Sequence, residues 1–122
     1  MEVTKIVFLL LLLIEIFLSH QPGEESGAES RALAKTLHIP EKWLRISAHV
    51  ILFAALSVLM ISSFPEIPMA LRIGVIGAWA FLDEWTKGFE IFKGRHFSWA
   101  DCGWNALGCV IGIAASLLVS TM

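Results

Sequence analysis

Four apolar blocks separated by polar connections dominate the pattern of this chain. The blocks are Ile6–Leu18, Ile46–Phe64, Met69–Leu82 and Cys102–Val119. A helix that crosses a membrane needs roughly 20 predominantly apolar residues, and each block reaches that length with its flanks. The pattern therefore predicts an all-α fold, an integral membrane bundle of four transmembrane helices at about 3–20, 45–64, 68–88 and 101–120. The whole chain, 1–122, then forms a single membrane domain.

The connection between the first two blocks is the longest. It opens with the turn-rich stretch Gln21–Gly27, and its apolar residues then recur at helical spacing: Ala28, Ala32, Leu33 and Leu37. This spacing predicts a short amphipathic helix on the membrane surface, an interfacial segment at about 28–39 that ends before Pro40. The second and third blocks are joined by the short stretch Ser62–Pro68, which makes their helices antiparallel neighbours.

Composition supports a membrane protein and excludes one class of partner. Hydrophobic residues make up 57% of the chain, and the mean hydropathy of +0.74 exceeds that of an ordinary soluble domain. A net charge of -2 argues against nucleic acid as a partner. Lys5 precedes the first block as in a signal peptide, but Glu15 within the block and a poor cleavage site after it favour an uncleaved helix.

The third connection and its flanks carry an unusual number of polar residues for a position between two apolar blocks. They are Asp83, Glu84, Lys87, Arg95, Asp101 and Asn105. A charged group at membrane depth costs ~2.5–3.5 kcal/mol on insertion scales, so such groups usually face a partner or a site. With four spans, the first and third connections lie on the same side of the membrane. The polar clusters are therefore expected to converge on one face.

Two rules assign this polar face to opposite sides of the membrane, and both orientations stay open. Most basic residues lie on it: Arg31, Lys35, Lys42, Arg45, Lys87, Lys93 and Arg95. The positive-inside rule places such a face in the cytoplasm. Lys5 before the first helix instead fits a cytoplasmic N-terminus, which places the polar face outside.

One stripe of the fourth predicted helix holds the residues Asp101, Asn105, Gly108 and Gly112. Gly108 and Gly112 form a small-residue pair that permits close backbone approach. The stripe is either a packing stripe with Asp101 as the helix N-cap or the wall of a polar pocket. On the second helix, Arg45 and His49 lie one turn apart on one face. His49 is read either as a hydrogen-bonded packing residue or as a ligand. No second His or Cys lies at ligand spacing from it, so no metal site and no cofactor are predicted.

The adjacent carboxylates Asp83 and Glu84 project about 100° apart on a helix. We therefore expect one of them to face inward, toward Arg95, whose planar guanidinium suits a carboxylate or a phosphate. The alternative for Asp83 is a pair with Lys87 at the helix end.

Taken in order along the chain, these motifs resemble the VanZ-like family of small bacterial membrane proteins. The resemblance begins with Ser19, Gln21, Pro22, Ser26 and Ser30, similar to the family's Ser-x-Gln-Pro…Ser…Ser. Arg45 and His49 follow, similar to its Arg-Lys-x-x-His. The longest part comprises Glu84, Lys87, Gly94, Arg95, Ser98, Asp101, Asn105 and Gly108. It resembles the family's Glu-x-x-Gln…Gly-Arg-x-x-Ser-x-x-Asp-x-x-x-Asn-x-x-Gly. Lys87 replaces a Gln, Ile46 a Lys, and Phe53 a common Tyr.

The resemblance implies a multi-pass protein of the bacterial cytoplasmic membrane. The family is named for a member that confers low-level resistance to teicoplanin, but the resemblance supplies no biochemical mechanism. The leading hypothesis is binding of an anionic membrane lipid or a lipid-linked cell-wall precursor. The candidate ligand-binding residues are Arg45, His49, Glu84, Arg95, Asp101 and Asn105. The secondary candidates are Ser19, Gln21, Ser26, Asp83, Lys87 and Ser98.

Two other hypotheses compete with ligand binding. The first is a membrane-embedded transferase or hydrolase acting on a lipid headgroup, with His49, Glu84 or Asp101 as acid–base. The second treats the polar residues as structural contacts between helices, so that their replacement would lower abundance instead of activity.

Overall fold

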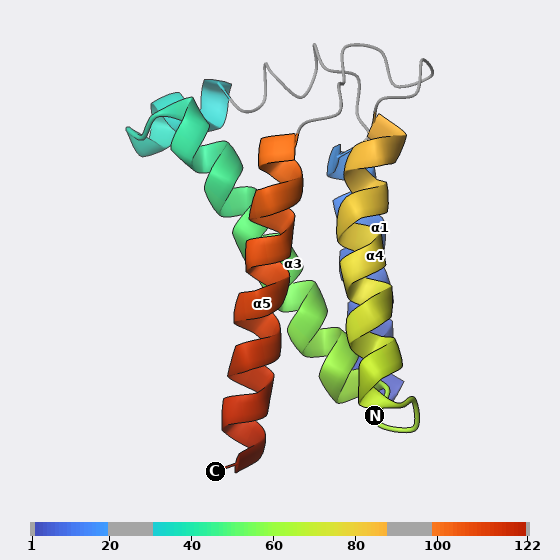
Figure 1. Cartoon of the computed structure of the whole chain (residues 1–122). Helices are drawn as coiled ribbons and strands as arrows, with labels where there is room; N and C mark the ends of the chain where they lie inside the picture. The colour runs from blue at the N-terminus through green and yellow to red at the C-terminus, as the bar shows by residue number, and fades with distance from the viewer. Residues whose placement is uncertain (1, 20–30, 88–98, 122) are drawn as a thin grey trace.

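A computed structural model describes residues 2–19, 31–87 and 99–121, and long helices dominate them (Figure 1). The long helices are α1 (Glu2–Ser19), α3 (Glu41–Ser63), α4 (Met69–Lys87) and α5 (Trp99–Thr121). A shorter helix at 31–37 precedes α3. The predicted all-α fold is confirmed, and the helices lie close to their predicted ranges. The helix at 31–37 falls within the predicted interfacial segment, whose residues 28–30 lie outside the described residues.

By length and composition alone, two of the helices can cross a membrane, namely α3 and α5. In the other two long helices, charged residues occur toward both ends, whereas Glu41, Lys42 and Arg45 of α3 all lie at its start. The charged residues are Glu2, Lys5 and Glu15 in α1, and Arg72, Asp83, Glu84 and Lys87 in α4. The prediction of four spans is thus supported for two helices.

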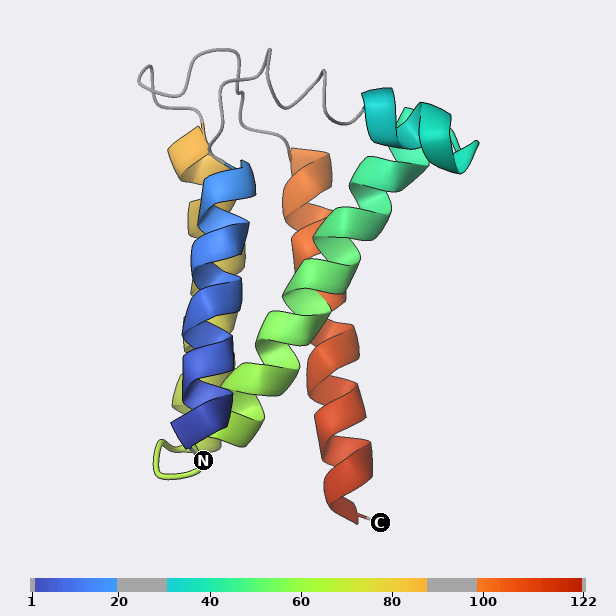
Figure 2. The same cartoon turned by 180° about the vertical axis from the view of Figure 1, so that it is seen from behind.

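The long helices form a bundle in which α1 and α4 run side by side and α3 crosses obliquely against α5 (Figures 1 and 2). The contact of α3 with α5 is the most extensive of the bundle. The short connection between Ser63 and Met69 makes α3 and α4 antiparallel neighbours, as predicted. Consequently the end of α1, the start of α3, the end of α4 and the start of α5 lie at one end of the bundle.

Two glycines allow α3 and α5 to approach closely. A Cβ atom added to Gly108 would lie 2.5 Å from the Val50 carbonyl oxygen. One added to Gly112 would overlap the carbonyl oxygen of Ala54 and lie 2.7 Å from the Cβ of Ser57. Only a residue without a side chain fits at such a contact, which confirms the predicted role of this small-residue pair. We call the contact of Gly108 and Gly112 with α3 the glycine seam.

The distribution of apolar and polar side chains is partly inverted relative to a soluble protein. A modest apolar core comprises Phe8, Phe53, Leu56, Met60, Ile76, Ala80 and Cys109. Polar and charged residues are buried beside it: Glu15, Ser57, Ser63, Arg72, Asp83, Glu84 and Asn105. Meanwhile α1 exposes a continuous set of large apolar side chains, from Val3 to Leu18. The outer surface of the bundle is therefore largely apolar.

At the bundle end that holds the α3–α4 connection, charged and aromatic side chains of different helices contact one another. Lys5 Nζ lies 3.0 Å from Glu66 Oε1 and 5.4 Å from the ring centroid of Phe64. The Phe64 ring meets Phe8 edge to face, with centroids 5.5 Å apart. The Arg72 guanidinium donates a hydrogen bond to the Ile61 carbonyl oxygen. These contacts tie α1 and α4 to the end of α3.

Candidate functional site

The bundle end opposite the α3–α4 connection gathers polar side chains from three helices. Arg45 and His49 come from α3, Asp83 and Glu84 from α4, and Asp101 and Asn105 from α5. We call the bundle end that holds these six residues the polar end. The predicted convergence on one face is confirmed for these six residues.

A chain of hydrogen bonds through Asn105 joins all three helices. Asn105 Nδ2 donates to the Ala80 carbonyl oxygen of α4 at 3.1 Å. Its Oδ1 lies 2.6 Å from His49 Nδ1 of α3. Because the amide nitrogen is directed to a carbonyl, Oδ1 is the acceptor, so His49 Nδ1 must carry the donated proton. Asn105 is fully buried, and it thereby fixes both the orientation and the tautomer of His49.

Asp101 lies between the two basic side chains of α3. Its Oδ2 is 3.6 Å from His49 Nε2, and its Oδ1 is 3.9 Å from Arg45 Nε. The prediction that Arg45 and His49 share one face of α3 is confirmed, since both reach the same carboxylate. As described, α5 begins at Trp99, so Asp101 lies within the first turn rather than at the N-cap. The polar-pocket reading therefore fits Asp101 and Asn105 better than the capping reading.

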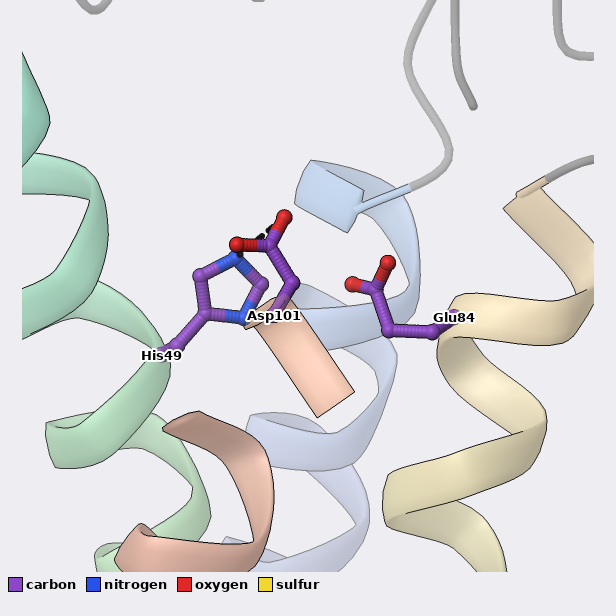
Figure 3. A group of neighbouring side chains, drawn as sticks. All are labelled: His49, Glu84 and Asp101. Atoms are coloured by element: carbon purple, nitrogen blue, oxygen red, sulfur yellow. Dashed lines mark ion pairs between the residues drawn. The ribbon is translucent and has the colours of Figure 1, made fainter. Parts of the chain in front are cut away.

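Both adjacent carboxylates of α4 are fully buried. One of the two was expected to face inward, and burial extends to both Asp83 and Glu84. The reason is that α4 contacts α1, α3 and α5, so more than one face of this helix is covered. In Figure 3 the Glu84 carboxylate points toward Asp101 and His49. One potential ligand atom from each of His49, Glu84 and Asp101 lies within 4.8 Å of the others.

A buried carboxylate on α1 was not among the candidate residues of the sequence analysis. Glu15 is almost completely buried, and its Oε2 accepts a hydrogen bond from Trp79 Nε1 of α4 at 3.1 Å. A charge in the middle of an apolar block was the available signal, because such residues usually face the interior of a bundle. In the sequence, Glu15 had argued only against a signal peptide.

Several predicted site residues lie outside the described part of the chain. They are Gln21, Ser26, Arg95 and Ser98. Ser19 and Lys87 end α1 and α4, and their side chains are likewise outside the description. The predicted approach of a carboxylate to Arg95 therefore stays a prediction, as does the pairing of Asp83 with Lys87.

Comparison with known proteins adds no relative. No protein-family model, curated protein or solved structure matches this chain.

The chemistry available at the polar end combines one imidazole, one amide, three carboxylates and one guanidinium. The Arg45 side chain is 60% exposed, whereas those of His49 and Asp101 are only 13% and 16% exposed. An exposed guanidinium at the mouth of a partly buried acidic and imidazole cluster can bind an anionic group from outside. The cluster below it can exchange protons or hold a cation.

Proposed function

We propose that this chain is a VanZ-like, four-span protein of the bacterial cytoplasmic membrane. In this proposal the polar end binds the anionic headgroup of a membrane lipid or of a lipid-linked cell-wall precursor. The ordered motif from Ser19 to Gly108 and the arrangement of the polar end support it. The same resemblance suggests a contribution to teicoplanin resistance, which a susceptibility assay with and without the expressed chain tests.

Membrane insertion of all four long helices is supported by what they bury and expose. Glu15, Asp83 and Glu84 are buried inside the bundle, while the outward positions of the helices carry large apolar side chains. Charged groups in spanning helices face the bundle interior, and a large exposed apolar surface requires a covering medium. The charged residues of α1 and α4 are unusual for spanning helices. Those whose side chains are described either face the bundle interior or lie at the bundle ends.

Binding of a phosphate headgroup rests on one observation, the position of Arg45 at the mouth of the polar end. Asp101 lies 3.9 Å from its Nε, and the Arg45 side chain is 60% exposed, so its guanidinium can be reached from outside the bundle. A guanidinium binds a phosphate through two parallel hydrogen bonds, and such bonds are roughly twice as strong as neutral ones. In the resemblance, Arg95 is the second guanidinium expected at the same site.

Lipid retention by the purified chain tests this proposal. Native mass spectrometry from detergent would compare phosphatidylglycerol adducts of the wild type with those of Arg45→Ala, Arg45→Lys and Arg95→Ala. The matched control is Lys42→Ala, which removes an exposed charge from the start of the same helix. We expect Arg45→Ala to lose the adduct, Arg45→Lys to weaken it and Lys42→Ala to keep it. Equal retention in all variants would refute a headgroup site at Arg45.

A second candidate function, favoured by the position of His49, is chemistry on the bound headgroup. His49 lies between an amide that fixes its tautomer and a carboxylate 3.6 Å from its other nitrogen. A histidine oriented in this way is typical of a general acid or base. Release of a headgroup from a purified lipid, lost in both His49→Gln and Asp101→Asn while lipid retention stays, would favour this function over simple binding.

A further inference from the structure

We infer that His49, Glu84 and Asp101 form a binding site for a divalent metal ion of the Mn²⁺ and Zn²⁺ class. The ligand atoms are His49 Nε2, Asp101 Oδ2 and a carboxylate oxygen of Glu84. This inference goes beyond the proposed headgroup binding and does not depend on it. It follows from the donor set, the separation of the three donors and the fixed tautomer of His49.

The three donors come from three different helices, which explains why spacing along the chain did not reveal them. His49 belongs to α3, Glu84 to α4 and Asp101 to α5 (Figure 3). An imidazole nitrogen with two carboxylate oxygens suits Zn²⁺ and Mn²⁺, because imidazole favours the former and carboxylate the latter. Three protein ligands also leave at least one coordination position for water or for an oxygen of another ligand.

The distances are those of a site that needs only a small adjustment. At metal–ligand bonds of about 2.1 Å, two ligand atoms can lie at most about 4.2 Å apart. The 3.6 Å between His49 Nε2 and Asp101 Oδ2 already falls within this limit. One ligand atom of each of the three residues lies within 4.8 Å of the others. A relative shift of less than about 1 Å would therefore bring all three ligand atoms within about 4.2 Å of one another.

The hydrogen bonds around His49 prepare it as a ligand. Its Nδ1 donates to Asn105 Oδ1, and Asn105 is itself held by the Ala80 carbonyl. In the neutral imidazole, Nε2 therefore carries the lone pair, and this nitrogen is the one that faces Asp101. A lone pair and a carboxylate at 3.6 Å repel unless a proton or a metal ion lies between them. Metal-ligating histidines almost always donate their other N–H to an oxygen in this manner.

The burial of the three residues fits uptake of an ion from solution. Glu84 is fully buried, whereas His49 and Asp101 are partly exposed at the bundle end. An ion can therefore reach Asp101 first and be enclosed by Glu84. The second oxygen of Asp101 faces Arg45, so metal binding would leave that ion pair in place.

Titration of the full chain in detergent with Mn²⁺ tests the inference. Bound ion would be counted by electron paramagnetic resonance, and pulsed measurements would detect an imidazole nitrogen coupled to the metal. We expect one ion per chain with such a coupling. His49→Ala, Glu84→Gln and Asp101→Asn should each weaken binding at least about tenfold. Asn105→Ala keeps all three ligands and should weaken it about 10–100-fold.

Matched controls are His38→Ala and Glu41→Gln, which remove an exposed imidazole and an exposed carboxylate outside the cluster. Both should bind Mn²⁺ as the wild type does. Absence of binding by the wild type, absence of a coupled imidazole nitrogen, or equal binding by all variants would overturn the inference. A wild type without bound ion or without the nitrogen coupling would overturn the inference even if a variant misfolds. Since the titration contains no phospholipid, and lipid retention can be measured with a chelator present, the two proposals fail separately.

Discussion

The contact between α3 and α5 has two halves of different chemical character, one of glycines packed against backbone and one of polar side chains. Toward the middle of the helices, the glycine seam brings Gly108 and Gly112 against the α3 backbone. Toward the polar end, the same two helices exchange contacts between His49, Asp101 and Asn105. The seam sets the separation of the helices by steric fit, and the polar half uses that separation to place donors and acceptors. Substitutions in the two halves should therefore have different consequences.

Filling the glycine seam should have the largest effect. Gly112→Leu forces a side chain into the Ala54 carbonyl and Ser57, and overpacking of this kind costs about 3 kcal/mol or more. We expect the loss in unfolding free energy, measured by denaturant titration in micelles. The matched control is Gly103→Ala on the same helix, where no atom lies within 4 Å of an added Cβ. Equal destabilisation by both substitutions would show that the seam is not a tight contact.

Removing the central amide of the polar half should come next. Asn105→Leu leaves His49 Nδ1 and the Ala80 carbonyl without their buried partner, and each such group costs about 1–3 kcal/mol. In a double-mutant cycle with His49→Leu, the two substitutions should be strongly non-additive, since they remove the same hydrogen bond. Additive losses in unfolding free energy would contradict direct coupling of the two residues.

A polar contact elsewhere in the bundle provides a comparison with the polar end. Trp79→Phe removes the hydrogen bond to the buried Glu15 carboxylate and should lower the unfolding free energy by about 1–2 kcal/mol. Lipid retention and Mn²⁺ binding per folded chain should stay unchanged, because this contact joins α1 to α4 without involving Arg45, His49, Glu84 or Asp101. A loss of either binding in Trp79→Phe would mean that binding simply follows stability.

Arg45→Ala should give the opposite result to Trp79→Phe, with lipid binding lost and stability kept. Its side chain is 60% exposed, and exposed ion pairs contribute about 0–1 kcal/mol. We therefore expect the unfolding free energy of Arg45→Ala to change by less than about 1 kcal/mol while lipid retention is lost. A large loss of stability would assign Arg45 to the structural framework.

The exposed ion pair at the opposite bundle end should give the smallest effect, visible only as a pH dependence. A backbone hydrogen bond at Glu66 and the neighbouring Lys5 lower the pKa of the Glu66 carboxyl below its usual 4.5. A lowered pKa in the folded state adds stability at neutral pH that is lost as the pH falls through that pKa. In Glu66→Gln this part of the acid dependence of unfolding should disappear. An unchanged acid profile would exclude the pair as a contributor.

Much of the fold could be predicted from the sequence because long helices leave a strong local signal. The apolar blocks and the two prolines of the α3–α4 connection located the helices to within a few residues. The small-residue pair Gly108 and Gly112 also predicted a close contact. That this pair contacts α3, and not another helix, depends on the tertiary arrangement. Spacing along one helix cannot reveal it.

The residues of the polar end could be recognised in the sequence, but their arrangement could be predicted only in part. Arg45 with His49, and Asp101 with Asn105, were recognised because each pair lies one helical turn apart. The burial of both Asp83 and Glu84, and the grouping of Glu84 with His49 and Asp101, arise from contacts between three helices. The role of Glu15 was missed for the same reason, since its partner Trp79 is on another helix.

The polar half of the α3–α5 contact should hold His49 in the tautomer and orientation that a ligand requires. Solid-state nitrogen NMR of histidine-labelled protein in bilayers would measure this, with the His49 signals assigned by comparison with His49→Gln. We expect a protonated Nδ1 that stays protonated when Zn²⁺ is added, while the Nε2 signal shifts to a metal-bound position. An Nε2 signal unaffected by Zn²⁺, or an Nδ1 that carries no proton, would show that His49 is not held as a ligand.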